Sequence, residues 1–347
     1  MTMRTRTTKT PAIDAGRRLR AGTLLLLAAV LWVPLQAPAA DGCYRDARPA
    51  MGSLLQITLC GAGDTARGVA ERTFARVAAL DSELTTWADD GPMIRFNAAA
   101  GSGPQPVPAV LHAALGDARL WAERTDGLFD PTLGPVLSLW RKAAARGELP
   151  AEDELAQARA RSGYQGLVLR SDRRAELMRP GMEVDLGAIG KGWALDRLAS
   201  ELPHSAGAAW LLDFGGSSFL AHGTPPGADA WRVAIRRDDG SVDCVVELRD
   251  GGLSVSGAHG RRHEIAGKQL SHIIDPRTGR PVRVLRFAIV AAPSATAAEA
   301  LSTALVVASR ADAPELGEGV WVRVHEEGAA LRQSAGFPLA ALPARAD

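Results

Sequence analysis

The sequence predicts an α+β fold, and two features of its pattern lead to that class. Strand-like segments cluster after Ala209, whereas the long helical patterns lie mostly before it and once more near the C-terminus. Strands that do not alternate with helices favour α+β over a doubly wound parallel sheet. The chain has 347 residues, of which 46% are hydrophobic, and can bury a full core. We therefore expect mixed or antiparallel sheets flanked by helices, in two intimately joined lobes.

In the N-terminal half, the first expected elements are a strand at 53–60 and a helix at 64–84, whose apolar residues recur at helical intervals. An exposed aromatic loop around Trp87 then runs into a Gly/Pro linker. A second helix is expected at 108–125. The turn that follows, Phe129-Asp130-Pro131, is compact and carries a carboxylate.

The second half begins with a charged helix and short strands at 143–179. A strand ending in Asp185 leads through a glycine-punctuated turn into another helix, and the strand-rich part follows. The last expected elements are a helix at 294–309 and a strand at 320–324. No internal repeat is evident.

The N-terminus has the pattern of a secretory signal peptide. Arg17, Arg18 and Arg20 precede an apolar run at 24–33 and small residues at 37–40. The apolar run is short for a membrane span, and the alternative is an uncleaved anchor. Adjacent arginines leave the general and twin-arginine export routes both open. We expect a signal peptide at 1–40 and one exported, periplasmic domain at 41–347.

The cysteines are three in number: Cys43, Cys60 and Cys244. None of their spacings is typical of a metal site, and an exported chain favours disulfides. We expect a disulfide between Cys43 and Cys60 that ties down the mature N-terminus. Lipidation of Cys43, which lies just past the cleavage region, is the alternative.

The formal net charge is +1, so bulk electrostatics does not select a partner. We expect no nucleic-acid partner. The sequence leaves the oligomeric state open.

The stretch DLGAIGKG, which starts at Asp185, enters a helix through glycines. Backbone N–H groups and the helix dipole at such a helix start favour an anion, so the stretch is a candidate phosphate cradle. It matches neither the P-loop nor the dinucleotide-binding glycine pattern. The alternative is that the glycines only permit tight packing. Lys191 either neutralises a phosphate or is solvated.

A second candidate site lies on the last helix, where Glu299 and Thr303 are spaced i and i+4 and Ser302 lies between them. A carboxylate with hydroxyls is an oxygen donor set that suits Mg²⁺ rather than zinc. Spacing alone favours another interpretation, a capping box in which Glu299 reaches back to Thr296.

The stretch SHIIDPRTGRPV, from Ser271 to Val282, combines a rigid turn with proton-handling side chains. His272 titrates near neutral pH and is a candidate general base, with Asp275 in the same loop. A structural β-turn is the alternative. Trp87 and Trp193 lie beside polar turns and are candidates for stacking on a planar ring, although core packing is commoner.

Seven short motifs in one order resemble the ApbE family of FAD:protein FMN transferases. The resemblance extends from Met51 to Leu305 and covers most of the mature chain. The motifs are MGS at Met51, FDPTLGP at Phe129, DLGAIGKGWALD at Asp185, LLDFGGS at Leu211, SVSG at Ser254, HIIDPRTGRPV at His272 and AEALSTAL at Ala298.

The resemblance implies an enzyme that binds FAD and Mg²⁺ and transfers FMN to a Thr or Ser hydroxyl of an acceptor flavoprotein, with release of AMP. The acceptor would belong to a membrane electron-transport complex. His272 and Asp275 would be catalytic. The implied metal ligands are Glu299, Ser302, Thr303 and the backbone carbonyl of Gly190. The implied flavin and nucleotide contacts are Met51, Trp87, Phe129, Asp130, Pro131, Gly187, Lys191, Trp193 and Ile273.

Three positions depart from the family pattern. Glu299 stands where the family usually has Asp, and its longer arm would weaken or shift the metal. Gly190 leaves its carbonyl available and is tolerable, whereas Ser217 replaces a more typical acidic residue or asparagine. Two other functions stay open on this reading: an FAD pyrophosphatase that yields FMN and AMP, and a non-catalytic flavin-binding assembly protein.

Overall fold

The computed structural model describes residues 42–203, 206–237, 240–257, 262–283, 286–309 and 311–340. The chain divides into two units, Met1–Ala37 and Pro38–Asp347, and every described residue belongs to the second. The predicted signal peptide therefore lies outside the described residues. Within the described ranges, no helix combines the length and apolar character needed to cross a bilayer.

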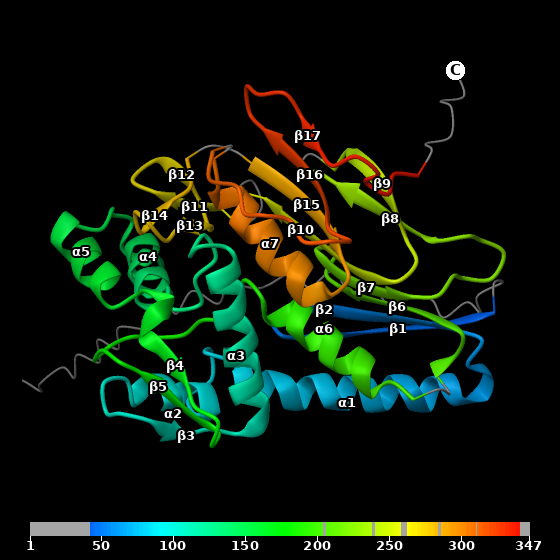
Figure 1. Ribbon diagram of the computed structural model, residues 1–347, viewed down its shortest axis with the longest axis horizontal. Helices are drawn as coiled ribbons and strands as arrows, with labels where there is room; N and C mark the ends of the chain where they lie inside the picture. The colour runs from blue at the N-terminus through cyan, green and yellow to red at the C-terminus, as the bar shows by residue number, and fades with distance from the viewer. Residues whose placement is uncertain are drawn as a thin grey trace, which may run out of the picture. The chain divides into compact units, whose positions relative to one another are not determined.

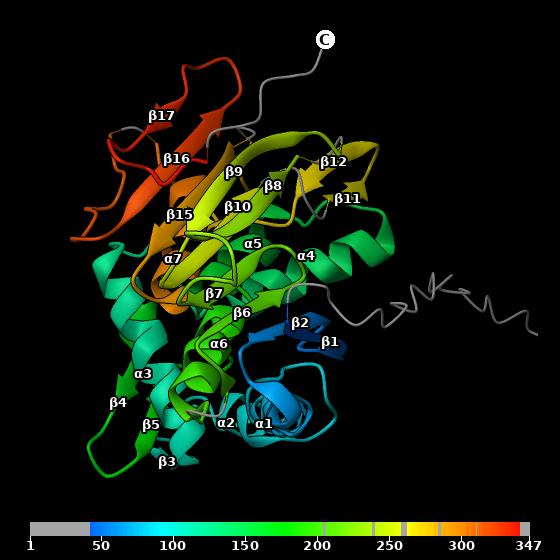
Figure 2. The same cartoon turned by 90° about the vertical axis from the view of Figure 1, so that its right-hand side faces the viewer.

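The core of the fold is an eight-stranded sheet (Figures 1 and 2) with the strand order β1-β2-β6-β7-β10-β15-β16-β17. Every neighbouring pair is antiparallel, which confirms the predicted α+β class. The strands are β1 (Cys43–Ala50), β2 (Ser53–Cys60), β6 (Ala209–Phe214), β7 (Ser218–His222), β10 (Gly251–Gly257), β15 (Arg286–Ala292), β16 (Trp321–Glu326) and β17 (Arg332–Gln333).

Smaller sheets surround the large one. Three strands pair in the order β3-β5-β4, and three hairpins join β8 with β9, β11 with β12 and β13 with β14. These strands are β3 (Gln105–Pro106), β4 (Leu167–Leu169), β5 (Arg174–Leu177), β8 (Trp231–Arg236), β9 (Val242–Leu248), β11 (Arg262–Ile265), β12 (Lys268–Ser271), β13 (Ile274–Asp275) and β14 (Arg280–Pro281).

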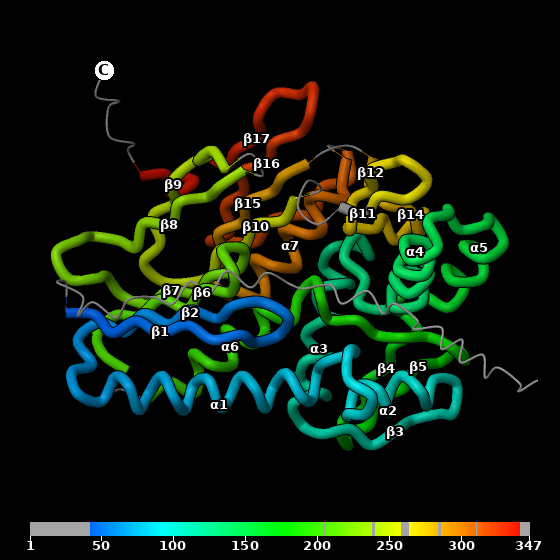
Figure 3. The backbone as a smooth tube through the Cα atoms, turned by 180° about the vertical axis from the view of Figure 1, so that it is seen from behind, coloured from blue at the N-terminus to red at the C-terminus, as the bar shows by residue number. Residues whose placement is uncertain are grey.

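Helices α1, α6 and α7 pack on one face of the large sheet, with α7 against β10 and β15, α6 against β7 and α1 against β1 (Figure 3). Each predicted long helix is present within three residues of its expected bounds. The helices are α1 (Ala66–Leu84), α2 (Pro92–Ala98), α3 (Ala109–Arg124), α4 (Gly134–Arg146), α5 (Glu152–Ala160), α6 (Gly190–Glu201) and α7 (Ala295–Val307), with 3-10 turns η1 (Gly63–Thr65) and η2 (Tyr164–Gly166).

Several of these elements were not predicted from the sequence pattern, β1, α2 and α4 among them. Strand β1 lies at the edge of the sheet, where polar side chains and a proline are tolerated, so it lacks a strand-like alternation. Helix α2 has only seven residues and starts at a proline after Gly91, which is too short for a helical period to show.

The alternation of side chains along the strands supplies two separate cores. Leu55, Ile57 and Leu59 of β2 face the core beneath the helices, whereas Cys60 belongs to the core on the opposite face. The β8–β9 hairpin covers that opposite face. A third core joins α4 and α5 to β11 and β13.

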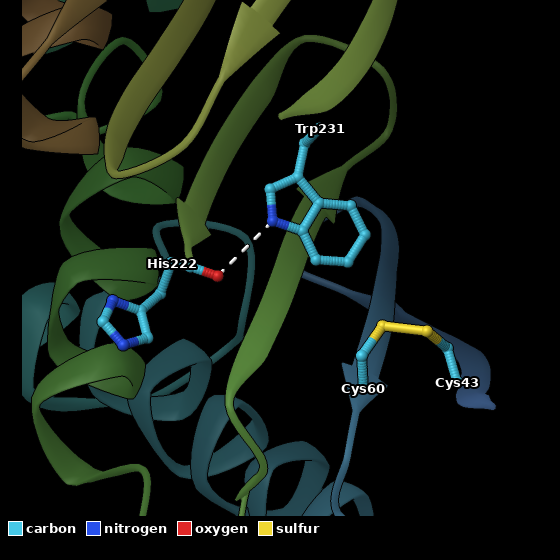
Figure 4. The surroundings of a disulfide bond; sticks show 4 residues. All are labelled: Cys43, Cys60, His222 and Trp231. Atoms are coloured by element: carbon cyan, nitrogen blue, oxygen red, sulfur yellow. Dashed lines mark hydrogen bonds between the residues drawn. A yellow bond between two sulfur atoms is a disulfide. The ribbon is translucent and has the colours of Figure 1, made fainter. Parts of the chain in front are cut away.

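The predicted disulfide between Cys43 and Cys60 is confirmed (Figure 4). The two cysteines are paired at the open end of the β1–β2 hairpin. Trp231 lies nearby and donates a hydrogen bond to the backbone carbonyl of His222 at 3.4 Å. Cys244 is a buried free thiol, and burial raises its pKa to about 12, so it is unreactive near neutral pH.

The disulfide generates a stability prediction. Its cysteines are 17 residues apart, and closing a loop of that size stabilises a domain by about 3 kcal/mol. Replacing both cysteines with serine should lower the free energy of unfolding by about that amount, as measured with urea. A reductant should destabilise the wild type and leave the double variant unchanged; equal effects on both proteins would contradict the prediction.

Candidate active site

The N-termini of α6 and α7 meet and exchange carboxylates. Asp196 of α6 accepts hydrogen bonds from the backbone N–H groups of Ala295 at 2.9 Å and Thr296 at 2.8 Å, at the start of α7. Glu299 of α7 accepts one from the N–H of Gly192 at 2.5 Å, in the first turn of α6. Each helix thus receives from the other an anion that satisfies its free N–H groups and its dipole.

This arrangement shows that the capping-box interpretation of Glu299 is wrong. The N-cap of α7 is Ser294, whose hydroxyl accepts a hydrogen bond from the N–H of Ala297 at 3.1 Å. The Glu299 carboxylate instead accepts hydrogen bonds from Gly192 and Ser218, and the residue is 4% exposed. The sequence signal for the true cap was the serine directly before the helical run.

The Lys191 ammonium lies among three oxygens beside Glu299. Its Nζ is 2.9 Å from Ser217 Oγ, 3.1 Å from Ser218 Oγ and 3.2 Å from Glu299 Oε1. Ser218 also donates to Glu299 Oε1 at 3.1 Å. The predicted phosphate cradle therefore already holds an anion and its counter-ion, and Lys191 is not simply solvated. Sequence reasoning missed Ser218.

A second carboxylate near Lys191, Asp213 on β6, was also missed. Burial raises the pKa of Asp213 to about 6, while the N–H of Gly216, at 2.7 Å from Oδ1, and the charge of Lys191 lower it. The LLDFGGS motif contains this residue. Its position in that motif, at the end of a strand before two glycines, was the available signal.

The expected metal ligands on α7 are only partly brought together. Ser302 is fully buried and its hydroxyl lies 3.0 Å from Ser254 Oγ and 2.8 Å from Ser256 Oγ. The Ser302 hydroxyl also donates to the backbone carbonyl of Glu299 at 3.0 Å. Two serines of β10 and this carbonyl therefore already engage the hydroxyl. Thr303 lies 3.5 Å from Ser256.

The remaining donors fit a hard cation by type. Glu299 and Thr303 present a carboxylate and a hydroxyl one helical turn apart, and Gly190 is the first residue of α6, whose Gly192 N–H donates to Glu299. All are oxygen ligands, which Mg²⁺ prefers. Among the described residues, no group of three or more His, Cys, Asp or Glu side chains could hold a metal.

The 271–282 loop has internal hydrogen bonds, and its carboxylate has an arginine partner. Asp275 accepts the N–H of Arg277 at 2.9 Å and pairs with its guanidinium at 2.8 Å. Arg277 also pairs with Asp312 and donates to the Val307 carbonyl at the end of α7 at 3.4 Å. The His272 side chain is exposed. Asp275 therefore organises the loop through Arg277.

At the predicted flavin end, Trp87 is 78% exposed. The Arg141 guanidinium lies 4.9 Å from its ring centroid and 3.6 Å from Asp185. Met51 has a left-handed backbone (φ +49°), and its N–H donates to Asp81 at 2.9 Å. A groove of ≈ 640 Å³ is lined in part by Trp87 and Asp81. The indole ring of Trp87 is therefore open to solvent at this groove.

The Phe129-Asp130-Pro131 turn is held in place by hydrogen bonds to Thr132, Tyr164 and Asp185. Phe129 is buried in the main core, and the expected contact of this turn with the flavin stays a prediction. The Asp130 carboxylate accepts the N–H groups of Thr132 at 2.7 Å and Tyr164 at 3.1 Å, and burial raises its pKa. Pro131 is buried as well, and its carbonyl accepts the N–H of Asp185 at 2.8 Å.

The other predicted contacts divide between core and surface. Trp193 is buried and donates to Asp117 at 2.8 Å, which supports core packing over stacking. Ile273 is buried in the same core. Gly187 is exposed, and its N–H donates to Asp185 at 2.8 Å in a tight turn.

The model of the ApbE family matches residues 51–322, which is most of the chain. This chain belongs to the ApbE family. Two relatives named FAD:protein FMN transferase come from Klebsiella pneumoniae (strain 342) and Treponema pallidum (strain Nichols). The first is 31% identical over 306 residues, or 85% of each chain. The second is 32% identical over 283 residues, or 76% of this chain and 78% of the relative.

A crystal structure of the flavinyl transferase ApbE from Pseudomonas stutzeri, in its apo form, has the same fold. It is 26% identical, with a TM-score of 0.74, and the match covers 85% of this chain and 95% of that one. The antiparallel sheet with helices on one face is thus the ApbE fold.

The raised pKa of Asp213 generates a pH prediction. Because the folded protein holds this proton more tightly than the unfolded chain, the stability that the protonated carboxyl provides is lost as the pH rises through about 6. The free energy of unfolding of Asp213→Asn, relative to that of the wild type, should therefore rise by about 1–2 kcal/mol as the pH is raised from about 4 to about 7. Urea unfolding across this range measures it, with exposed Asp172→Asn as the control. A pH-independent difference would contradict the prediction.

Proposed function

We propose that this protein is an FAD:protein FMN transferase that modifies a Thr or Ser hydroxyl of an acceptor flavoprotein. In this reaction the hydroxyl oxygen bonds to the phosphorus of the FMN half, the pyrophosphate P–O bond breaks, and AMP leaves with the bonding electrons. The observation that carries the proposal is the charge cluster at the meeting point of α6 and α7, in a chain whose family relatives bear this name.

Cleaving a pyrophosphate requires that its negative charge be neutralised. Lys191 supplies a cation at the start of α6, and its ammonium is partly exposed, with a side-chain exposure of 23%. Glu299 and Thr303, with the carbonyl of Gly190 and with Ser302 behind them, would hold Mg²⁺. When bound, Mg²⁺ supplies further charge neutralisation at the phosphates.

The acceptor hydroxyl must lose its proton, and His272 is our candidate base. The loop that carries it is fixed at several points, including a hydrogen bond from Trp140 to the Gly279 carbonyl at 2.8 Å. A rigid loop keeps a base in position, which matters because small displacements of a catalytic group reduce the rate strongly. At the other end of the substrate, Trp87 and Met51 would contact the flavin ring.

We further propose export to the periplasm and an acceptor in a membrane electron-transport complex. The arginine-flanked apolar run at the N-terminus supports export. The disulfide supports it as well, because such bonds persist in oxidising compartments.

The decisive experiment weighs an acceptor. The mature protein is incubated with FAD, Mg²⁺ and a candidate acceptor flavoprotein domain, and the acceptor is analysed by mass spectrometry. A mass gain equal to FMN with release of AMP is expected. AMP release without the mass gain would indicate an FAD pyrophosphatase instead, and the absence of both would indicate a flavin-binding assembly protein.

The assignment of His272 generates a separate prediction. His272→Ala should bind FAD with the affinity of the wild type and lose transfer by about 100-fold or more, because general base catalysis contributes this much. Calorimetry measures binding, and acceptor mass measures transfer. His112→Ala changes a half-buried histidine on α3, whose Nε2 lies 2.9 Å from the Arg170 carbonyl, and should leave transfer unchanged. Wild-type transfer rates in His272→Ala would reject the role.

A further inference from the structure

The cluster around Lys191 already resembles an occupied cation site. Its ammonium is within 3.2 Å of three oxygens that come from two different parts of the chain, the start of β7 and the middle of α7. Both oxygens of Glu299 are engaged: Oε1 by Lys191 and Ser218, and Oε2 by the N–H of Gly192. The protein itself thus provides the positive charge that this carboxylate needs.

Burial makes that charge necessary. The Glu299 side chain is only 5% exposed, and removing the partner of a buried charge is strongly destabilising. A divalent cation that binds the same carboxylate would place two positive centres side by side. At such distances two positive charges repel each other strongly outside bulk water. The Lys191 ammonium and the divalent cation therefore cannot both stay in close contact with the Glu299 carboxylate.

The two partners differ in mobility. Gly192 contributes a backbone group inside α6, whereas Lys191 contributes an ammonium on a flexible four-carbon stem that reaches partly into solvent. Lys191 is therefore the partner that can leave.

We propose that Lys191 is the resting counter-ion of Glu299, and that a divalent cation displaces it and frees its ammonium for the substrate pyrophosphate. This inference rests on the proposed function. It implies positive coupling: the cation makes Lys191 available to the nucleotide, and a nucleotide that holds Lys191 makes Glu299 available to the cation. By linkage the two affinities rise by the same factor.

The test uses the nucleotide-free, full-length mature protein and Mn²⁺ as the probe for the Mg²⁺ site, with free Mn²⁺ measured by electron paramagnetic resonance. Lys191→Met removes the competitor and keeps an apolar stem of similar length. We expect Mn²⁺ affinity to rise by about tenfold over the wild type. Lys142→Met, an exposed lysine on α4, is the matched control and should bind Mn²⁺ as the wild type does.

A second variant protects the test if Lys191→Met does not fold. Ser217→Ala removes the oxygen closest to the ammonium, at 2.9 Å, and leaves the charge in place. It should raise Mn²⁺ affinity in the same direction by a smaller factor. Mn²⁺ affinity that is unchanged or lowered in the folded variants would overturn the proposal.

Glu299→Gln tests whether Mn²⁺ is bound at this site. In the double variant that combines Lys191→Met with Glu299→Gln, the rise in Mn²⁺ affinity seen in Lys191→Met should be abolished. A gain that persists in the double variant would place the ion elsewhere and overturn the proposal. Because FAD and acceptor are absent, a failed transfer assay with a positive Mn²⁺ result would refute only the proposed function.

Discussion

The exchange of carboxylates between α6 and α7 is the interaction on which the rest of the site depends. A helix start leaves several N–H groups without partners, and two such ends that face each other would otherwise place like partial charges together. Asp196 and Glu299 resolve this conflict in both directions. Lys191 belongs to the first turn of α6, and Thr303 follows Glu299 on α7. The same exchange therefore determines where the Lys191 ammonium and the Thr303 hydroxyl lie.

The antiparallel sheet contributes the polar floor of the site. Ser218 on β7 and Ser254 on β10 are paired across adjacent strands, and both contact residues of α7. Buried hydroxyls are tolerated only where each finds a partner, and Ser302 provides one from the helix. The sheet therefore binds α7 by hydrogen bonds as well as by apolar contact, which restricts how far the helix can shift.

Helix α7 also connects the two chemical parts of the site. Its N-terminal half carries Glu299, and its C-terminal carbonyl at Val307 accepts a hydrogen bond from Arg277 in the His272 loop. A helix of 13 residues is a stiff rod about 20 Å long, so it holds the His272 loop at a constant distance from the charge cluster. This is why Asp275 matters: its pairing with Arg277 completes that connection.

The sequence by itself determined the long helices, the disulfide pairing and the family. Apolar spacing reports local backbone geometry, three cysteines leave few possible pairings, and ordered motifs preserve the family pattern. Only the tertiary structure decided that Glu299 binds Gly192, that Phe129 and Trp193 are core residues, and that the pKa of Asp213 is raised. The physical reason is that a buried polar group is satisfied by whichever element packs against it. Glu299 and Gly192 are 107 residues apart, a separation at which no local period carries information.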